Sequence, residues 1–120
     1  MNRPKLLIVD DDFYTRHALR SLFARRGWDV TLAESVAEGL SALDAAPLCI
    51  ILDLNLPDGG GETILREARS RLPRTLVAVC SACEDARQLA VVQGLNPELM
   101  LCKPIDLAPL DRLCLAALAG

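Results

Sequence analysis

The stretch Lys5-Leu-Leu-Ile-Val-Asp-Asp11 decides the fold, because a short apolar run stops abruptly at two acidic residues. The same pattern recurs at Ile50–Leu52 before Asp53, at Leu76–Cys80 before Ser81 and at Leu99–Cys102 before Lys103. Continuous apolar runs of this length are typical of parallel strands covered on both faces. Because the carboxyl ends of parallel strands share one edge of a sheet, we expect carboxylates, a hydroxyl and an ammonium group to meet there. Open α/β sheets bind ligands at this edge.

Strand patterns alternate with helical patterns along the whole chain. Strands are expected at residues 5–9, 28–33, 48–52, 75–80 and 99–102, each followed by a helical pattern. Ser35 begins a capping-box sequence before the second helix, and Asp106 is the expected cap of the last. Strict alternation predicts a doubly wound α/β fold, with a parallel five-stranded sheet flanked by five helices. Without a linker or repeat, residues 1–120 are expected to form a single domain.

Composition excludes several classes of function. The chain has 120 residues, 52% of them hydrophobic, and a net charge of −3, so it can build a core but offers no basic surface for nucleic acid. The arginines are densest at positions 66, 69, 71 and 74, interleaved with Glu62 and Glu67, which we interpret as a solvated helix face. The longest apolar stretch, Leu113–Ala119, is too short to cross a bilayer. A cytoplasmic location without membrane contact is therefore expected.

The cysteines allow a competing interpretation. Four of the five, Cys49, Cys80, Cys102 and Cys114, lie in apolar runs, where we expect buried, reduced thiols. Cys80-Ser-Ala-Cys83 has the spacing of a redox pair at a strand-to-helix junction, as in thioredoxin-like proteins. Five alternating units do not match that fold, so redox catalysis is the less favoured alternative.

The acidic residues at the strand ends predict a metal site. Asp10, Asp11 and Asp53 would repel one another and raise their own pKa values unless a cation neutralised them. Mg²⁺ suits such a site, because it prefers carboxylate oxygen and keeps waters that a phosphate can displace. A backbone carbonyl near Asn55 would complete the coordination.

Together these residues resemble the signature of bacterial two-component response regulator receiver domains, including the chemotaxis receivers. The resemblance is carried, in order, by Ile8-Val-Asp-Asp11, by Leu52-Asp-Leu-Asn-Leu-Pro57 followed by Gly61, by Ser81-Ala82 and by Lys103-Pro104. It covers nearly the whole chain and implies a flavodoxin-like fold with strand order 2-1-3-4-5.

The resemblance also implies a role for each site residue. Asp53 would be the phospho-acceptor, Asp10 and Asp11 would hold Mg²⁺ with it, and the backbone carbonyl of Asn55 would be a further ligand. Ser81 would then meet the incoming phosphoryl group and Lys103 would neutralise its charge.

Such a domain catalyses only its own phosphorylation and dephosphorylation, and is not an enzyme acting on an external substrate. A sensor histidine kinase or a histidine phosphotransfer protein would supply the phosphoryl group. The surface near the fourth helix, fifth strand and fifth helix would then change, acting on an output protein or on an output domain beyond this chain. The protein would be a monomer or a phosphorylation-promoted dimer.

Residues at the switch position and at the positions that tune hydrolysis bear on how the domain would switch and reset. Met100 occupies the position where many receivers carry an aromatic switch residue, so an aromatic-coupled switch is not expected. Asn55 and Cys83 occupy the positions that tune the hydrolytic water, and the small Cys83 side chain favours a slow to intermediate reset.

Two alternatives remain beside the redox one. The domain could be a docking module that works without phosphorylation, which the complete acid pair, acceptor and lysine disfavour. Asp10-x-Asp12 also has the spacing of haloacid-dehalogenase-like phosphatases, but that interpretation leaves Asp53 unexplained.

Overall fold

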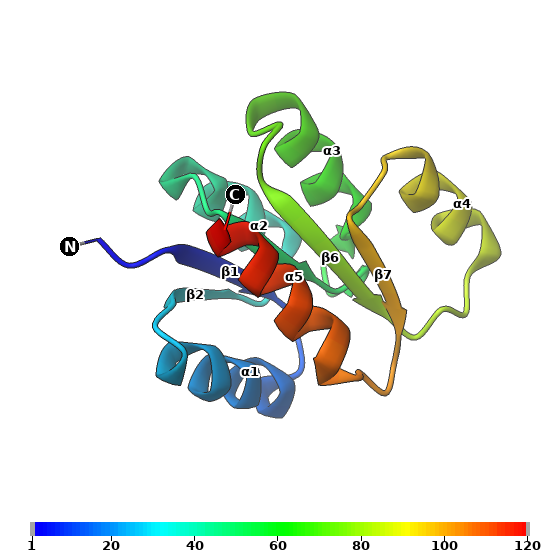
Figure 1. Ribbon diagram of the computed structural model, residues 1–120. Coiled ribbons are helices and arrows are strands. Elements are labelled where there is room, and N and C mark those ends of the chain that lie inside the picture. The colour runs from blue at the N-terminus through cyan, green and yellow to red at the C-terminus, as the bar shows by residue number, and fades with distance from the viewer. Residues whose placement is uncertain (1, 120) are drawn as a thin grey trace.

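The central sheet has five parallel strands in the order β2-β1-β3-β6-β7 (Figure 1), which confirms the predicted order. The computed structural model describes residues 2–119. The strands are β1 (Lys5–Val9), β2 (Asp29–Ala33), β3 (Cys49–Leu52), β6 (Leu76–Ser81) and β7 (Leu99–Cys102). In the register of this sheet Val9 pairs with Leu52, and Ser81 pairs with Cys102. The polar residues that follow these positions therefore leave the sheet at one edge.

Helices cover both faces of the sheet, as predicted. On one face lie α1 (Phe13–Arg25) and α5 (Leu107–Ala119), and on the other lie α2 (Val36–Ala42), α3 (Glu62–Arg71) and α4 (Ala86–Gly94). A short 3₁₀ turn, Leu43–Ala45, follows α2. Side-chain caps begin four of the helices within residues 2–119, because Asp12, Ser35, Asp85 and Asp106 accept hydrogen bonds from backbone N–H groups of the first turn, which confirms the expected cap at Asp106. None of the helices among residues 2–119 is long and apolar enough to cross a membrane.

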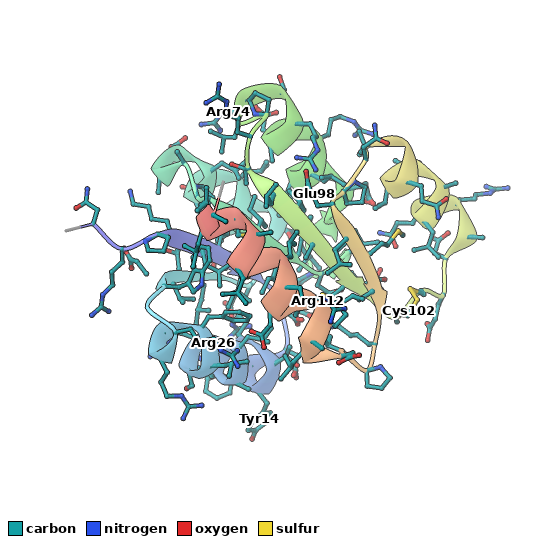
Figure 2. The ribbon with its side chains drawn as sticks, viewed as in Figure 1. Tyr14, Arg26, Arg74, Glu98, Cys102 and Arg112 are labelled. Carbon is teal, nitrogen blue, oxygen red and sulfur yellow. A yellow bond between two sulfur atoms is a disulfide. The ribbon has the colours of Figure 1, made fainter. Side chains whose placement is uncertain are left out.

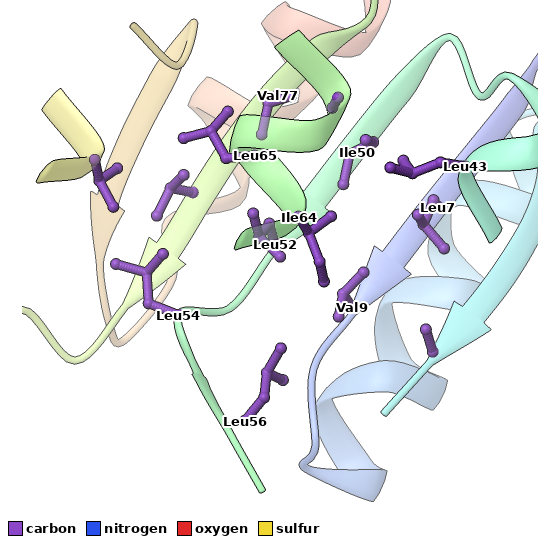
Figure 3. Close-up of a cluster of buried hydrophobic side chains, with 14 residues drawn as sticks. Leu7, Val9, Leu43, Ile50, Leu52, Leu54, Leu56, Ile64, Leu65 and Val77 are labelled. Carbon is purple, nitrogen blue, oxygen red and sulfur yellow. The ribbon is translucent and has the colours of Figure 1, made fainter. Parts of the chain in front are cut away.

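Alternate residues of the strands build two separate cores. Leu7, Val9, Ile50 and Leu52 face α2, α3 and α4, and pack with residues such as Ile64 (Figure 3). The intervening residues Leu6, Ile8, Cys49 and Ile51 pack with Leu19 and Phe23 of α1 and with Leu110 of α5. This alternation explains why the central strands appear as continuous apolar runs.

The prediction of full burial fails for β7. Leu99, Met100 and Leu101 are half-buried and Cys102 is exposed. The physical reason is that β7 is an edge strand, with a neighbour on one side only.

The predicted turn after the third strand contains a small hairpin. Strands β4 (Asn55–Leu56) and β5 (Gly59–Gly60) pair antiparallel. At its tip the Asp58 carboxylate accepts hydrogen bonds from the backbone N–H groups of Val36 (2.7 Å) and Ala37 (3.0 Å). These bonds fasten the hairpin to the first turn of α2.

Arg69 is not part of a solvated face, which corrects the sequence interpretation at this position. Its guanidinium donates to the backbone carbonyls of Thr75 (2.9 Å), Leu95 (3.3 Å) and Asn96 (2.8 Å), and it pairs with Glu98 at 2.6 Å. The side chain thereby ties α3 to the loop before β7. Sequence alone gave no partner for it, because the loop carbonyls meet it only in the fold.

The cysteine interpretation also needs correction. Cys49, Cys80 and Cys114 are buried free thiols, as expected. Cys102, however, is exposed at the end of β7 and forms a disulfide with Cys83 (Figure 2). Cys83 is therefore bonded to the neighbouring strand end and not to Cys80, so the C-x-x-C pair considered from the sequence is not formed.

Candidate functional site

The two buried aspartates are fixed through their backbones. The Asp10 N–H donates to the carbonyl of Ala33 at 3.0 Å, and the Asp53 N–H donates to the carbonyl of Val9 at 2.8 Å. These bonds extend the ladders of the sheet beyond β1 and β3. The exposed fractions of Asp10 and Asp53 are 3% and 5%. Both carboxylates are thus held by the rigid sheet, where little water competes for them.

Lys103 contacts both aspartates. Its ammonium lies 3.2 Å from Oδ2 of Asp10 and 3.1 Å from Oδ2 of Asp53. Its backbone N–H donates to the carbonyl of Ser81 at 2.7 Å, and the following peptide bond to Pro104 is cis. The structure therefore brings together three groups that are separated by up to 93 residues in the sequence.

The second oxygen of each carboxylate is also engaged. Oδ1 of Asp10 accepts from the backbone N–H of Asp12 at 2.9 Å, and Oδ1 of Asp53 accepts from the N–H of Asn55 at 3.3 Å. Backbone donors orient the carboxylates while leaving lone pairs for another ligand.

Burial and charge shift the pKa values in this cluster. Burial raises the pKa of Asp10, and the charge of Asp53 adds to that rise, while the Asp12 N–H and Lys103 oppose it. For Lys103, burial alone would lower the pKa, but the combined attraction of Asp10 and Asp53 outweighs it, so the pKa is raised. The ammonium therefore stays charged beside two carboxylates.

Asp11 completes an acidic cluster suited to a cation. One carboxylate oxygen from each of Asp10, Asp11 and Asp53 lies within 4.8 Å of the other two, and Asp11 is exposed to solvent. Three carboxylate oxygens with an opening to water fit a hard divalent ion such as Mg²⁺, which keeps part of its hydration shell.

The sequence analysis missed Arg16. Its guanidinium donates to the Asp10 carbonyl at 2.9 Å and pairs with Glu34 at 3.2 Å, and it supports the backbone behind the cluster. The available signal was its position: Arg16 shares a helical stripe with Leu19 and Phe23, all three buried. A charged residue on an apolar stripe needs a partner.

The remaining predicted residues lie at the end of β6, in the loop after it, on β7 and in the β4–β5 hairpin. Ser81 is buried at the end of β6, and its hydroxyl oxygen accepts from the N–H of Cys83 at 3.1 Å. The Cys83 backbone has a φ of +60°, in the left-handed region. Met100 is half-buried and packs with the core beneath α4. Asn55 is exposed at the start of the β4–β5 hairpin.

Comparison with known proteins identifies the relatives of this chain. Residues 6–114 match the response regulator receiver domain family. The response regulator protein PilR of Pseudomonas aeruginosa is 34% identical over 121 residues, covering 98% of this chain. The chain spans only 27% of PilR. An uncharacterised 14.6 kDa protein of Leptolyngbya boryana is 36% identical over 121 residues, which covers 92% of this chain and 90% of that protein.

Solved structures give the same result. A response regulator receiver protein from Pseudomonas putida superposes with a TM-score of 0.86 and 28% identity, covering 97% of this chain and 98% of that one. A CheY-like receiver domain from Methanospirillum hungatei reaches a TM-score of 0.89 at 20% identity, covering 98% and 95% of the two chains, and so shows the shared fold. From its sequence match and its sheet topology, the chain belongs to the response regulator receiver domain family.

Proposed function

We propose that Asp53 of this receiver domain accepts a phosphoryl group in a Mg²⁺-dependent reaction, and that the modified domain signals to an output partner. The observation that carries the proposal is the contact of one ammonium group, that of Lys103, with both Asp10 and Asp53. In this arrangement Asp53 would act as the nucleophile, Lys103 would supply a positive charge, and the acidic cluster of Asp10, Asp11 and Asp53 would hold the cation.

The reaction follows from the chemistry of these side chains. A carboxylate oxygen of Asp53 attacks the phosphorus of a phosphohistidine or of a small acyl phosphate, and the bond from phosphorus to the donor atom breaks. The product is an acyl phosphate on Asp53, and the donor leaves with the bonding electron pair. Phosphoryl transfer depends chiefly on positioning and on neutralising charge.

Each group in the cluster has a task in this reaction. Bound Mg²⁺ would neutralise phosphoryl charge, held by Asp10, Asp11, Asp53 and the backbone carbonyl of Asn55. Lys103 lies 3.1 Å from Oδ2 of Asp53 and can bind a phosphoryl oxygen with little movement.

Ser81 and its loop provide the switch. The Ser81 hydroxyl accepts a hydrogen bond from Cys83, so its own proton is available for a phosphoryl oxygen. Moving Ser81 toward that oxygen would displace the loop before α4 and alter the surface formed by α4, β7 and α5. With Met100 in place of an aromatic residue, this displacement replaces a ring reorientation. The side chains of Asn55 and Cys83 would set how fast water hydrolyses the acyl phosphate. Cys83 is bonded to Cys102 and so is not the small free thiol on which the expected slow to intermediate reset was based.

The proposed partners follow from this chemistry. A sensor histidine kinase or histidine phosphotransfer protein in the cytoplasm would donate the phosphoryl group. An output protein or a further domain would recognise the altered surface, and the receiver would act as a single domain, either monomeric or dimerising on phosphorylation.

Intact-mass spectrometry after incubation with acetyl phosphate tests the proposal. The wild-type chain is expected to gain one phosphoryl group with Mg²⁺ and none with EDTA. Asp53→Asn should gain none, whereas Asp44→Asn, a control at an exposed aspartate paired with Arg71, should behave as wild type. A chain that binds Mg²⁺ but gains no mass would refute the proposal and favour a docking module that works without phosphorylation.

A further inference from the structure

The Cys83–Cys102 disulfide joins the two segments that carry the proposed switch. Cys83 lies two residues after Ser81, and Cys102 immediately precedes Lys103. Their Cα atoms are 5.5 Å apart, although the residues are 19 positions apart in the chain. Figure 2 shows the sulfur atoms beside the carboxyl end of β7, at the surface of the molecule.

Cys83 and Cys102 are the two cysteines of this chain that solvent can reach. Cys102 is exposed and Cys83 is half-buried, whereas Cys49, Cys80 and Cys114 are buried. Burial also raises the pKa of Cys80 to about 12. Thiol–disulfide exchange requires a thiolate to reach a sulfur atom of a disulfide, so small thiols in solution can attack the Cys83–Cys102 bond. The three buried cysteines are free thiols that disulfides in solution cannot reach.

The bridge restrains the loop that Ser81 must move. Ser81 already forms hydrogen bonds with both segments that the bridge joins. Its carbonyl accepts from the Lys103 N–H at 2.7 Å, and its hydroxyl accepts from the Cys83 N–H at 3.1 Å. The disulfide adds a covalent link between the two donors' segments. It limits the distance between the Cα atoms of Cys83 and Cys102 to about 7 Å.

The backbone conformation of Cys83 indicates how the loop would respond to reduction of the bridge. With a φ of +60°, this residue is in the left-handed conformation, which costs free energy for a residue with a β-carbon. Once the sulfur is released, nothing covalent keeps Cys83 in that conformation. The loop from Ser81 to the start of α4 then has more conformations available.

We propose that the Cys83–Cys102 bridge is a redox switch of the receiver, in which the disulfide resists phosphorylation-linked movement of Ser81 and reduction permits it. The inference rests on the proposed function, since it assumes phosphorylation at Asp53. Its effect is to make the response depend on both a phosphoryl donor and the thiol redox state.

Reduction proceeds with glutathione as the thiol. One glutathione thiolate attacks the sulfur of Cys102, the more exposed residue of the pair, and the S–S bond breaks to release the Cys83 thiolate. A second thiolate attacks the glutathione sulfur of the mixed disulfide, which releases the Cys102 thiolate and forms oxidised glutathione. Two glutathione thiols are oxidised, one protein disulfide is reduced, and two protons end on Cys83 and Cys102.

The test uses the complete chain equilibrated with reduced or oxidised glutathione. Alkylation under denaturing conditions, read by mass, should label five cysteines in the reduced protein and three in the bridged protein. Phosphorylation by acetyl phosphate with Mg²⁺ is then followed over time. We expect the bridged form to react about tenfold more slowly, the effect of losing one hydrogen bond to a charged group. Amide hydrogen exchange at residues 82–86 should be faster in the reduced form.

Cys102→Ser supplies the matched control, because the variant cannot form the bridge but keeps the other four cysteines. The substituted side chain is exposed, so the core is not disturbed. The variant should react like reduced wild type in both glutathione buffers. Equal rates for bridged and reduced wild type would overturn the redox switch, as would a redox response that survives in Cys102→Ser. If neither form gains a phosphoryl group, the proposed function itself fails, and the alkylation result still reports whether the bridge responds to glutathione.

Discussion

Replacing Gly61 with alanine should displace the backbone at Asp53, the proposed phospho-acceptor, which lies eight residues earlier in the sequence. Gly61 is buried at the start of α3, and its N–H donates to the carbonyl of Leu54 at 2.8 Å. A β-carbon at this position would overlap the carbonyl oxygen of Asp53 and lie 3.0 Å from Cα of Leu54. These atoms belong to the backbone, so no side-chain rotation can relieve the overlap.

The size of the effect follows from the contact. Restoring ordinary van der Waals separation requires the Asp53–Leu54 backbone or the start of α3 to move by about 1 Å. Overpacking of this kind lowers the free energy of unfolding by about 3 kcal/mol, which lowers Tm by about 12 °C in a domain of this size. A displacement of about 1 Å at Asp53, the proposed nucleophile, should also slow phosphorylation about 100-fold.

Thermal unfolding and the acetyl phosphate reaction measure the two effects. Gly94→Ala is the matched control, because a β-carbon there meets nothing within 4 Å, and it should leave both the Tm and the reaction rate close to wild type. The backbone of Gly61 has a φ of −64°, which alanine adopts freely, so the predicted loss comes from lack of space alone. If Gly61→Ala behaved like Gly94→Ala, the described packing behind Asp53 would be wrong.

Three other substitutions test separate parts of the structure. Lys103→Met removes the positive charge that lies 3.1–3.2 Å from Asp10 and Asp53. Mg²⁺ should therefore bind several-fold more tightly, as measured by calorimetric titration, while phosphorylation slows. Weaker Mg²⁺ binding would contradict the role assigned to this charge. Hydrogen bonds from two backbone N–H groups of α2 lower the pKa of Asp58 below its usual value. The ionised carboxylate therefore stabilises the fold above about pH 4, and this stabilisation disappears as the pH falls through the lowered pKa. Asp58→Asn should therefore be less stable than wild type at pH 7 in urea unfolding, and the gap should shrink below pH 4; a gap independent of pH would contradict this. Arg69→Met loses hydrogen bonds to three backbone carbonyls and the ion pair with Glu98. The free energy of unfolding should fall by about 2–3 kcal/mol, with little change in the phosphorylation rate. A variant as stable as wild type would show that these bonds make no net contribution to stability.

Sequence reasoning performed best where local pattern and topology agree. Strands β1 and β7 were predicted at their observed bounds, because apolar runs ending on a polar residue define both limits. The convergence of Asp10, Asp53 and Lys103 followed from parallel strand ends sharing one edge of the sheet. The sequence could therefore indicate the site before any distance was known.

It performed worst where a residue's partner is set by packing between distant segments. Leu99–Cys102 looked like a buried strand, but its position at the edge of the sheet exposes Cys102 and brings it to Cys83. Arg69 was interpreted as part of a solvated helix face and Arg16 carried no prediction, yet both donate to backbone carbonyls that only the folded chain places beside them. Hydrophobic pattern shows which face is buried, but not which polar groups meet there.

The most direct test of the central claim is to locate the phosphoryl group on the protein. After reaction with acetyl phosphate and Mg²⁺, borohydride reduces an aspartyl phosphate to homoserine, and peptide mass spectrometry then identifies the converted position. The structure predicts conversion at Asp53, held 3.1 Å from the Lys103 ammonium, and at no other aspartate of the cluster. Conversion at Asp10 or Asp11, or a phosphorylated protein in which Asp53 is unchanged, would contradict the assignment of Asp53 as the acceptor.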